Sequence, residues 1–408
     1  MSARLESGGF RAVPVAEGVY WVGAIDWALR DFHGYATARG TTYNAYLLTG
    51  PRPTLIDTVK APFIEEMMAR IASVTDPAAI DVIVSNHAEM DHSGALPATI
   101  ERVRPGTVLT SPLGVAALGD NLHLGATLTP VKNGESVEVG GRTLRFFETK
   151  MLHWPESMVT YLDDAAVLFS QDAFGMHLAS SERFDDELPW ELLESEAAKY
   201  FANILLLYSP RILKVLDALP TLGISPAMVA PDHGPVWRSH FDRIAGLYRR
   251  WATQAPTDRA VIVYDTMWGS TATMGRAIAD GVAEAGATPR VLPLSGSHRS
   301  DVATELLEAG ALVVGSPTIN NQMFPTVADV LCYLRGLRPA GRIGAAFGSY
   351  GWGGEAPRLI DETLSAMKVQ RVAEPLRVKY VPDEPALEQC RSLGILVGRT
   401  LRERVGRG

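Results

Sequence analysis

The second part of the chain alternates strictly between β-type runs and helical stretches. Five apolar runs follow one another from residue 260, and an amphipathic stretch comes after each, the last at 386–405. The runs read AVIVYDTM, PRVLPLS, ALVVGSPT, RIGAAFGSY and LRVKYV. This alternation is typical of parallel sheets, because each helix returns the chain to the start of the next strand. We therefore predict a doubly wound α/β domain here.

A change of rhythm near residue 250 indicates a domain boundary. Before it, short β-type runs and helical stretches mix without strict order, which predicts a sheet packed with helices. The segment WATQAPTDRA at 251–260 carries a proline and small polar residues, as linkers do. A length of 408 residues suits two or three domains. We predict two, at 1–253 and 258–408.

Composition and charge exclude several classes of protein. Apolar residues make up 47% of the chain and charged residues 21%, the balance of an ordinary globular protein. The net charge of −8 disfavours nucleic acid and anionic membranes as partners. The N-terminal stretch lacks the apolar core of a signal peptide, and the densest apolar run, ILLLY at 204–208, is too short to span a bilayer. We expect a cytoplasmic protein.

The chain contains two cysteines, Cys332 and Cys390. Both fall in helix-like segments and neither belongs to a C-x-x-C pair, which argues against a disulfide framework, a zinc knuckle or an iron–sulfur cluster. We expect both thiols to be buried and inert.

A dense group of metal-ligating side chains follows the apolar run at 82–84. The segment NHAEMDHSGALP, residues 86–97, places His87, Glu89, Asp91 and His92 within six positions. Packing alone rarely accounts for two imidazoles and two carboxylates beside a buried strand, because burying their charges is costly without a cation. The pattern predicts a metal site.

Three further candidates also follow predicted strands, where α/β sheets collect their binding groups. They are His153 in KMLHWPES, Asp172 in SQDAFG and His233 in APDHGP. Taken singly, each has an ordinary explanation as a hydrogen-bonded histidine or a helix cap. Together the four imidazoles and three carboxylates suffice for two metals with one carboxylate bridging.

Glu89 bears on which metal is bound. It occupies a position where a histidine would suggest a zinc hydrolase, and a carboxylate makes the ligand set harder and more negative. Such a set suits iron or manganese better than zinc and favours redox chemistry.

Three loops of the second domain predict a flavin site. The segment YDTMWGSTATMGRAIA at 264–279 can surround a phosphate at a helix N-terminus, although alone it also fits an ordinary Ser/Thr-rich cap. SPTINNQMF and SYGWGGE follow the next strands near the switch point of a 2-1-3-4-5 sheet, where such folds hold FMN. FAD would need an adenine site that the sequence does not offer. The candidate FMN residues are Thr266, Met267, Trp268, Gly269, Ser270, Thr271, Ser316, Pro317, Thr318, Ile319, Asn320, Asn321, Ser349, Tyr350, Gly351, Trp352 and Gly353.

The motifs HAEMDHSG, LHWPES, SQDAFG and PDHGP, in this order and spacing, resemble those of the flavodiiron proteins. The resemblance extends over nearly the whole chain and implies an N-terminal metallo-β-lactamase-like αββα sandwich followed by a C-terminal flavodoxin-like domain. It also implies that one iron is held by His87, Glu89 and His153, that the other is held by Asp91, His92 and His233, and that Asp172 bridges them. His33 and Tyr200 lie in stretches that resemble the surroundings of the family's substrate pocket. We read His123, His177, His240 and His298 as structural or solvated.

The resemblance implies a reductase of dioxygen, nitric oxide or both, with FMN and two irons as cofactors. Because no C-x-x-C module follows the second domain in these 408 residues, we expect a separate donor: a rubredoxin, a flavin reductase or a reduced deazaflavin. A head-to-tail homodimer or a dimer of dimers is also implied. Two alternatives remain open at this point, a dinuclear zinc hydrolase with an appended flavodoxin domain and a flavodoxin-like electron carrier or gas sensor.

Overall fold

The structure is a computed structural model that describes residues 9–124 and 128–406. The described chain divides into two compact units. The first contains residues 9–32, 37–200 and 210–249, and the second contains 33–36, 201–209 and 250–406. In neither unit is any described helix long and apolar enough to cross a bilayer.

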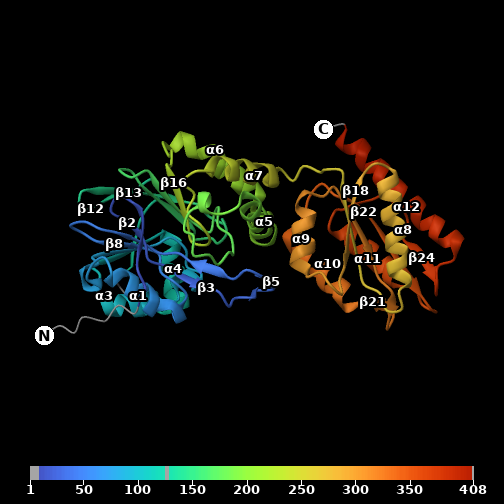
Figure 1. Ribbon diagram of the computed structural model, residues 1–408, viewed down its shortest axis with the longest axis horizontal. Helices are drawn as coiled ribbons and strands as arrows, with labels where there is room; N and C mark the ends of the chain where they lie inside the picture. The colour runs from blue at the N-terminus through green and yellow to red at the C-terminus, as the bar shows by residue number, and fades with distance from the viewer. Residues whose placement is uncertain (1–8, 125–127, 407–408) are drawn as a thin grey trace. The chain divides into compact units, whose positions relative to one another are not determined.

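The first unit is built on two main sheets (Figure 1). One has seven strands in the order β1 (Val13–Ala16), β2 (Val19–Trp21), β7 (Tyr46–Leu48), β8 (Thr54–Ile56), β9 (Val82–Ser85), β10 (Thr107–Thr110) and β11 (Leu128–Pro130). The other has five, in the order β12 (Ser136–Val139), β13 (Arg142–Glu148), β14 (Met158–Leu162), β15 (Val167–Gln171) and β16 (Met228–Pro231). A small ribbon pairs β3 (Ala24–Asp26) with β6 (Thr41–Tyr43). The two-residue strand β4 (Asp31–Phe32) belongs to this unit, whereas β5 (Tyr35–Ala36) lies in the segment assigned to the second unit.

Alternating side chains place one hydrophobic core between the sheets and another outside the first sheet. Tyr46 and Leu48 of β7 pack into the inner core with Phe146 and Phe169 of the second sheet. Leu47, between them in sequence, points to the outer core, because successive residues of a strand face opposite sides. Helices α1 (Ile64–Ala72), α3 (Leu96–Val103) and α4 (Pro112–Leu122) contribute buried residues to that outer core.

The remaining helices of the first unit are α2 (Met90–Ser93), α5 (Trp190–Tyr200), α6 (Ser209–Ala218) and α7 (Phe241–Thr253). The last three follow strands of the second sheet and lie near β16 in Figure 1. Two sheets packed face to face with helices outside them form the αββα sandwich, so this part of the predicted fold is confirmed.

The second unit contains a parallel sheet in the order β18 (Thr288–Pro293), β17 (Arg259–Tyr264), β19 (Ala311–Gly315) and β22 (Ile343–Tyr350), with β23 (Gln370–Arg371) and β24 (Leu376–Lys379) both beside β22. This is the 2-1-3-4-5 order on which the prediction of the flavin loops relied, and the doubly wound fold that the alternation predicted is confirmed. A small hairpin, β20 (Thr318–Ile319) and β21 (Gln322–Met323), follows β19. The helices are α8 (Ser270–Glu284), α9 (Arg299–Glu308), α10 (Pro325–Leu337), α11 (Ala356–Ala366) and α12 (Glu384–Val405).

Two glycines let α8 and α12 pack with their backbones in contact. A Cβ atom at Gly281 would overlap the carbonyl oxygen of Arg391, and one at Gly394 would overlap that of Ile278. Both helices contribute to the core on one face of the parallel sheet. No larger residue fits at either position without separating the helices.

The prediction that both thiols are buried is half wrong. Cys390 lies in the core on α12, where burial raises its pKa to about 11. Cys332 is exposed. The buried stripe of α10 contains Leu331 and Leu334, and Cys332 follows Leu331 by one position, which turns it about 100° away from that stripe.

Candidate metal centre and cofactor pocket

The seven predicted ligands come from segments that follow four strands of the first unit. His87 and Glu89 follow β9 of the first sheet, and the short helix α2 carries Asp91 and His92. From the second sheet, His153 lies beyond β13, Asp172 directly follows β15, and His233 lies just beyond β16. Strands β13, β15 and β16 run in the same direction, so their carboxyl ends meet at one edge of the sheet. The two sheets thus bring together seven side chains that are spread in sequence from residue 87 to residue 233.

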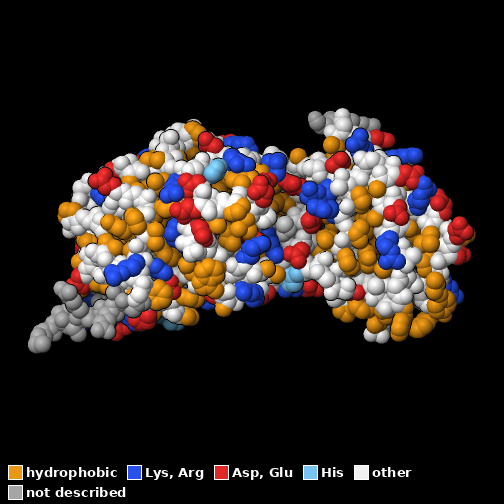
Figure 2. Space-filling view, viewed as in Figure 1, with side chains coloured by type: hydrophobic (Ala, Val, Ile, Leu, Met, Phe, Trp, Pro, Cys, Tyr) orange, Lys and Arg blue, Asp and Glu red, His pale blue; other side chains and the backbone are white. Residues whose placement is uncertain are grey.

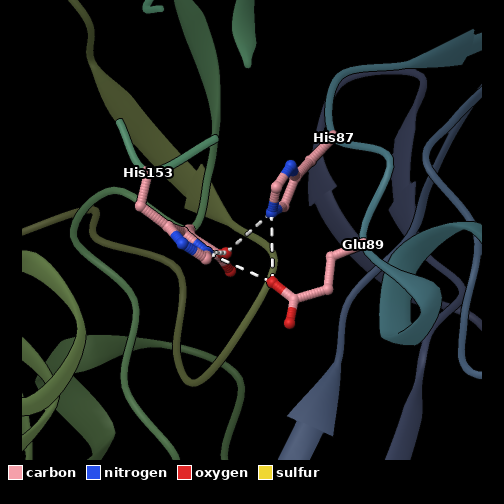
Figure 3. A group of neighbouring side chains, drawn as sticks. His87, Glu89 and His153 are labelled. Atoms are coloured by element: carbon pink, nitrogen blue, oxygen red, sulfur yellow. Dashed lines mark hydrogen bonds and ion pairs between the residues drawn. The ribbon is translucent and has the colours of Figure 1, made fainter. Parts of the chain in front are cut away.

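His87, Glu89, His153 and Asp172 form the first group. The side chains of His87, Glu89 and His153 point toward one another in Figure 3. Oε2 of Glu89 lies 3.4 Å from Nε2 of His87 and 3.2 Å from Nε2 of His153. Oδ2 of Asp172 lies 3.4 Å and 2.8 Å from the same two nitrogens. Ligands bonded to a metal at about 2.1 Å lie roughly 3.0–3.4 Å apart. Three of these four spacings fall in that range, and the fourth, 2.8 Å between Asp172 and His153, is slightly shorter.

Asp91, His92 and His233 form the second group. The Asp91 carboxylate lies 3.2 Å from Nε2 of His233 and 3.4 Å from Nε2 of His92. All three side chains are buried, with at most 4% of their surface exposed. The group again offers nitrogen and oxygen donors at spacings that a single metal ion requires.

Asp172 faces both groups with different oxygens. Its Oδ2 contacts His87 and His153, whereas its Oδ1 lies 3.3 Å from Nε2 of His92 and 3.5 Å from Nε2 of His233. A carboxylate in this position can bind two ions, one through each oxygen.

The donor atoms have the character of metal ligands. Within the described chain, Nε2 of His87 and His92, Oδ1 of Asp172 and both carboxylate oxygens of Asp91 are buried without a hydrogen-bond partner. Buried polar groups are normally paired, so five such atoms facing one another indicate a missing partner of positive charge. The residues therefore fit a pair of metal ions.

Electrostatics support the same conclusion. Burial alone would lower the pKa of His87 and raise that of Asp172, but the neighbouring groups of opposite charge override it, so that the pKa of His87 is raised well above its ordinary value and that of Asp172 is far below it. Burial likewise opposes charge on His92, yet the carboxylates of Asp91, Asp172 and Asp232 raise its pKa to about 10. The pKa values of Glu89, Asp91 and Asp172 are all lowered, so these three candidate ligands remain ionised and attract a cation.

A cavity of about 730 Å³ lies at the carboxyl ends of the parallel strands in the second unit. Its lining consists of Met267, Trp268, Ser270, Pro317, Thr318, Ile319, Asn320, Asn321, Ser349, Tyr350, Gly351, Trp352, Gly353, Tyr380 and Val381. Trp268 is 94% exposed and Trp352 89%, and Figure 2 shows hydrophobic side chains gathered along the edge of this unit near β21 and β24. Exposed aromatic rings beside a cavity that is mainly apolar, with a few polar side chains such as Ser270, Asn320 and Ser349, suit a planar, partly polar cofactor.

Four predicted FMN residues lie in these loops without lining the cavity. Thr266 Oγ1 accepts a hydrogen bond from the backbone of Gly269, and the hydroxyls of Thr271 and Ser349 are 2.8 Å apart. Ser316 Oγ accepts a hydrogen bond from the backbone N–H of residue 324. These contacts hold the loops in shape around the cavity.

Comparison with known proteins identifies the family. Residues 262–394 match the flavodoxin family, and residues 41–234 match the ODP family of beta lactamases. The chain is 45% identical to a nitric oxide reductase of Moorella thermoacetica, over 94% of this chain and 97% of the relative. The structure of rubredoxin oxygen:oxidoreductase from Desulfovibrio gigas superimposes with a TM-score of 0.95 and 43% identity, covering 97% of this chain and all of that one. The flavodiiron protein of Giardia intestinalis gives a TM-score of 0.93 at 34% identity, covering 97% of this chain and 98% of the other.

The chain belongs to the flavodiiron protein family. The similarity in sequence and in structure covers nearly the full length of this flavodiiron protein and therefore includes both of its units. It is an oxidoreductase, like the relatives named above.

The two predicted pocket residues of this flavodiiron protein have different surroundings. Tyr200 ends α5 and is buried, with its ring centroid 5.1 Å from that of His177 and 6.1 Å from that of His233. Burial, and next the charge of Asp172, raise the pKa of Tyr200 well above its ordinary value. His33 is exposed in the turn between β4 and β5, in a segment that belongs to the second unit. The role of each residue stays a prediction.

Several residues near the sites were not predicted as functional. Tyr380 and Val381 line the cavity and directly follow β24. The three predicted flavin loops follow the first, third and fourth strands, and the same reasoning applied after the fifth strand would have found these two residues. His177, expected to be structural or solvated, is buried, its Nδ1 lies 2.9 Å from Thr41 Oγ1, and its ring packs 4.7 Å from that of His233. Its role stays a prediction. Glu156 contacts the metal group through His87, and its place in LHWPES, three residues after a ligand, was the available signal.

Proposed function

We propose that this flavodiiron protein reduces dioxygen to water, nitric oxide to nitrous oxide, or both, with two irons and FMN as cofactors. The observation that carries the proposal is Asp172, whose two oxygens face two separate groups of ligands. In the proposed assignment His87, Glu89 and His153 hold one iron, and Asp91, His92 and His233 hold the other. When bound, FMN supplies two electrons and each iron one, enough to reduce dioxygen to two waters.

The protein side of the site has three tasks in this proposal. The carboxylates hold the two positions close together and at low charge, and burial of the ligands keeps bulk water away. Tyr200 stays protonated, because its pKa is raised well above the ordinary value, so its hydroxyl is available as a hydrogen-bond donor. In the second unit, Ser270 opens α8 at the cavity, where backbone N–H groups of the first turn suit the FMN phosphate.

Electrons are proposed to come from a separate donor, a rubredoxin, a flavin reductase or a reduced deazaflavin. The name of the Desulfovibrio gigas relative supports a rubredoxin and dioxygen, and that of the Moorella thermoacetica relative supports nitric oxide. We place the protein in the cytoplasm, as a head-to-tail homodimer or dimer of dimers.

The proposal is tested by reducing the holoenzyme without oxygen and then adding one gas at a time. We expect rapid reoxidation of flavin and iron by dioxygen, by nitric oxide with release of nitrous oxide, or by both. A protein that contains zinc, hydrolyses esters or lactams and consumes neither gas would instead be the dinuclear hydrolase.

Glu89 should decide which metal is retained. We expect Glu89→His to lower the iron content and raise the zinc content of protein grown in medium containing both, because a hard carboxylate is replaced by an imidazole. Metal analysis of purified protein measures this. Glu101→His, the same substitution at an exposed position of α3, serves as the control and should leave the metal content unchanged. An unchanged ratio of iron to zinc in Glu89→His would refute this role.

The proposed homodimer predicts that electrons pass between chains. One variant, His92→Ala, keeps FMN but lacks an iron ligand, and the other, Ser270→Asp, keeps the irons but loses FMN. Each is expected to be inactive alone, and mixed dimers should regain activity, because each contains one complete FMN and iron pair facing across the interface. Subunit exchange is verified by mass spectrometry. Exchanged dimers that stay inactive would exclude transfer between chains.

A further inference from the structure

Glu156 contacts the metal group from behind one of its histidines. Its Oε1 lies 2.9 Å from Nδ1 of His87, and it also accepts a hydrogen bond of 3.0 Å from the backbone N–H of Ala88. The side chain is 3% exposed. The backbone carbonyl of Glu156 accepts a 2.6 Å hydrogen bond from Ser111, the residue before α4. The carboxylate is thus held by two consecutive residues, His87 and Ala88, while Ser111 holds the backbone of Glu156 from a second segment.

This contact fixes which ring nitrogen of His87 carries the proton. A carboxylate can only accept, so Nδ1 must carry it, and the lone pair of Nε2 is then directed at the position that Glu89, His153 and Asp172 surround. A carboxylate behind an imidazole also makes the imidazole a more basic ligand than a neutral acceptor does.

The other histidines of the cluster have different partners. Nδ1 of His233 lies 2.6 Å from the backbone carbonyl oxygen of Thr42, a neutral acceptor. Nδ1 of His92 is 3.6 Å from Asp232, beyond the length of a hydrogen bond. Of these three histidines, only His87 has a carboxylate at hydrogen-bonding distance from its Nδ1, so the two metal positions differ in the basicity of their ligands.

We propose that Glu156 is a positioning residue that orients His87 and makes one position of the metal pair more electron-rich than the other. The inference rests on the proposed di-iron function. It concerns the affinity and the reduction potential of the iron bound by His87, Glu89 and His153.

Two substitutions separate the effect of Glu156 on the orientation of His87 from its effect on the basicity of the ring. Glu156→Gln keeps an oxygen that can accept from both N–H groups but removes the charge, whereas Glu156→Ala removes the acceptor as well. We expect Glu156→Ala to release one of its two irons to a ferrous chelator about 10–100-fold faster than the wild type, the usual effect of losing such a partner. Glu156→Gln should release iron at nearly the wild-type rate, but the midpoint potential of one iron should become more positive, since its ligand is less basic.

A matched control exists in the same unit. Asp185 is buried and accepts hydrogen bonds from Nδ1 of His240 at 2.9 Å and from the backbone of the same residue. Asp185→Asn makes the same chemical change away from the metal group. We expect it to leave iron release and both potentials unchanged, even where it lowers the melting temperature.

Iron content, chelator kinetics and a redox titration followed by electron paramagnetic resonance decide the outcome. Unchanged release in Glu156→Ala together with unchanged potentials in Glu156→Gln would overturn the inference while leaving the di-iron function intact. If Glu156→Ala does not fold, the potentials of Glu156→Gln alone decide. Wild-type protein that binds no iron would overturn the proposed function and this inference with it.

Discussion

Replacing Asp172 by alanine is expected to abolish gas reduction and iron binding together, while FMN stays bound. This side chain contributes oxygens to both groups of ligands, at 2.8 Å from Nε2 of His153 and 3.3 Å from Nε2 of His92. Its removal therefore weakens both positions at once and leaves imidazoles facing one another. The loss should exceed the roughly 10–100-fold effect of removing a partner outside the ligand set.

Iron content, FMN content and gas consumption are measured on the same preparation. Asp163→Ala is the control, because Asp163 is an exposed residue of the turn after β14 and pairs with Arg145 of β13 at 2.7 Å. It should keep iron, flavin and turnover. An Asp172→Ala protein that retains both irons would show that this carboxylate is not the bridge.

Ser270→Asp is expected to release FMN and leave the irons in place. Ser270 begins α8 and lines the cavity, so an aspartate there places a negative charge where the phosphate is proposed to bind. Two unit charges about 4 Å apart repel by roughly 1–4 kcal/mol between fully aqueous and partly buried surroundings. The affinity for FMN should therefore fall by about 5- to 1000-fold.

Flavin fluorescence during titration of the apoprotein measures the affinity. Ser270→Asn has nearly the same size as the aspartate variant without its charge, and it should bind FMN much more tightly than Ser270→Asp. Equal affinities in the two variants would mean that the phosphate binds elsewhere in the cavity.

Much of the fold was predictable because it depends on local pattern. The five apolar runs after residue 260 became strands of the parallel sheet, since a buried strand needs an apolar run and its helix needs an amphipathic one. The short strands β3, β4, β5 and β6 escaped prediction, because strands of two or three residues are too short to show a period. Exposure of Cys332 also depends on the exact face that α10 turns to the sheet.

That the seven candidate ligands lie together was predictable for a similar reason. Each candidate follows a strand. Ordinary packing rarely accounts for two imidazoles and two carboxylates within residues 87–92. Tyr380 and Val381 were missed although they follow a predicted strand, because their residue types are common in cores and carry no chemical signal.

The sequence by itself determined the two fold classes, the order of the strands in the second domain and the residue types available at the metal group. Only the tertiary structure decided how they meet: that Asp172 turns one oxygen to each group, that His177 is buried beside His233, and that Glu156 lies behind His87. The physical reason is that periodicity reports which face of a strand or helix is apolar, whereas the meeting of side chains from two sheets depends on how those sheets pack.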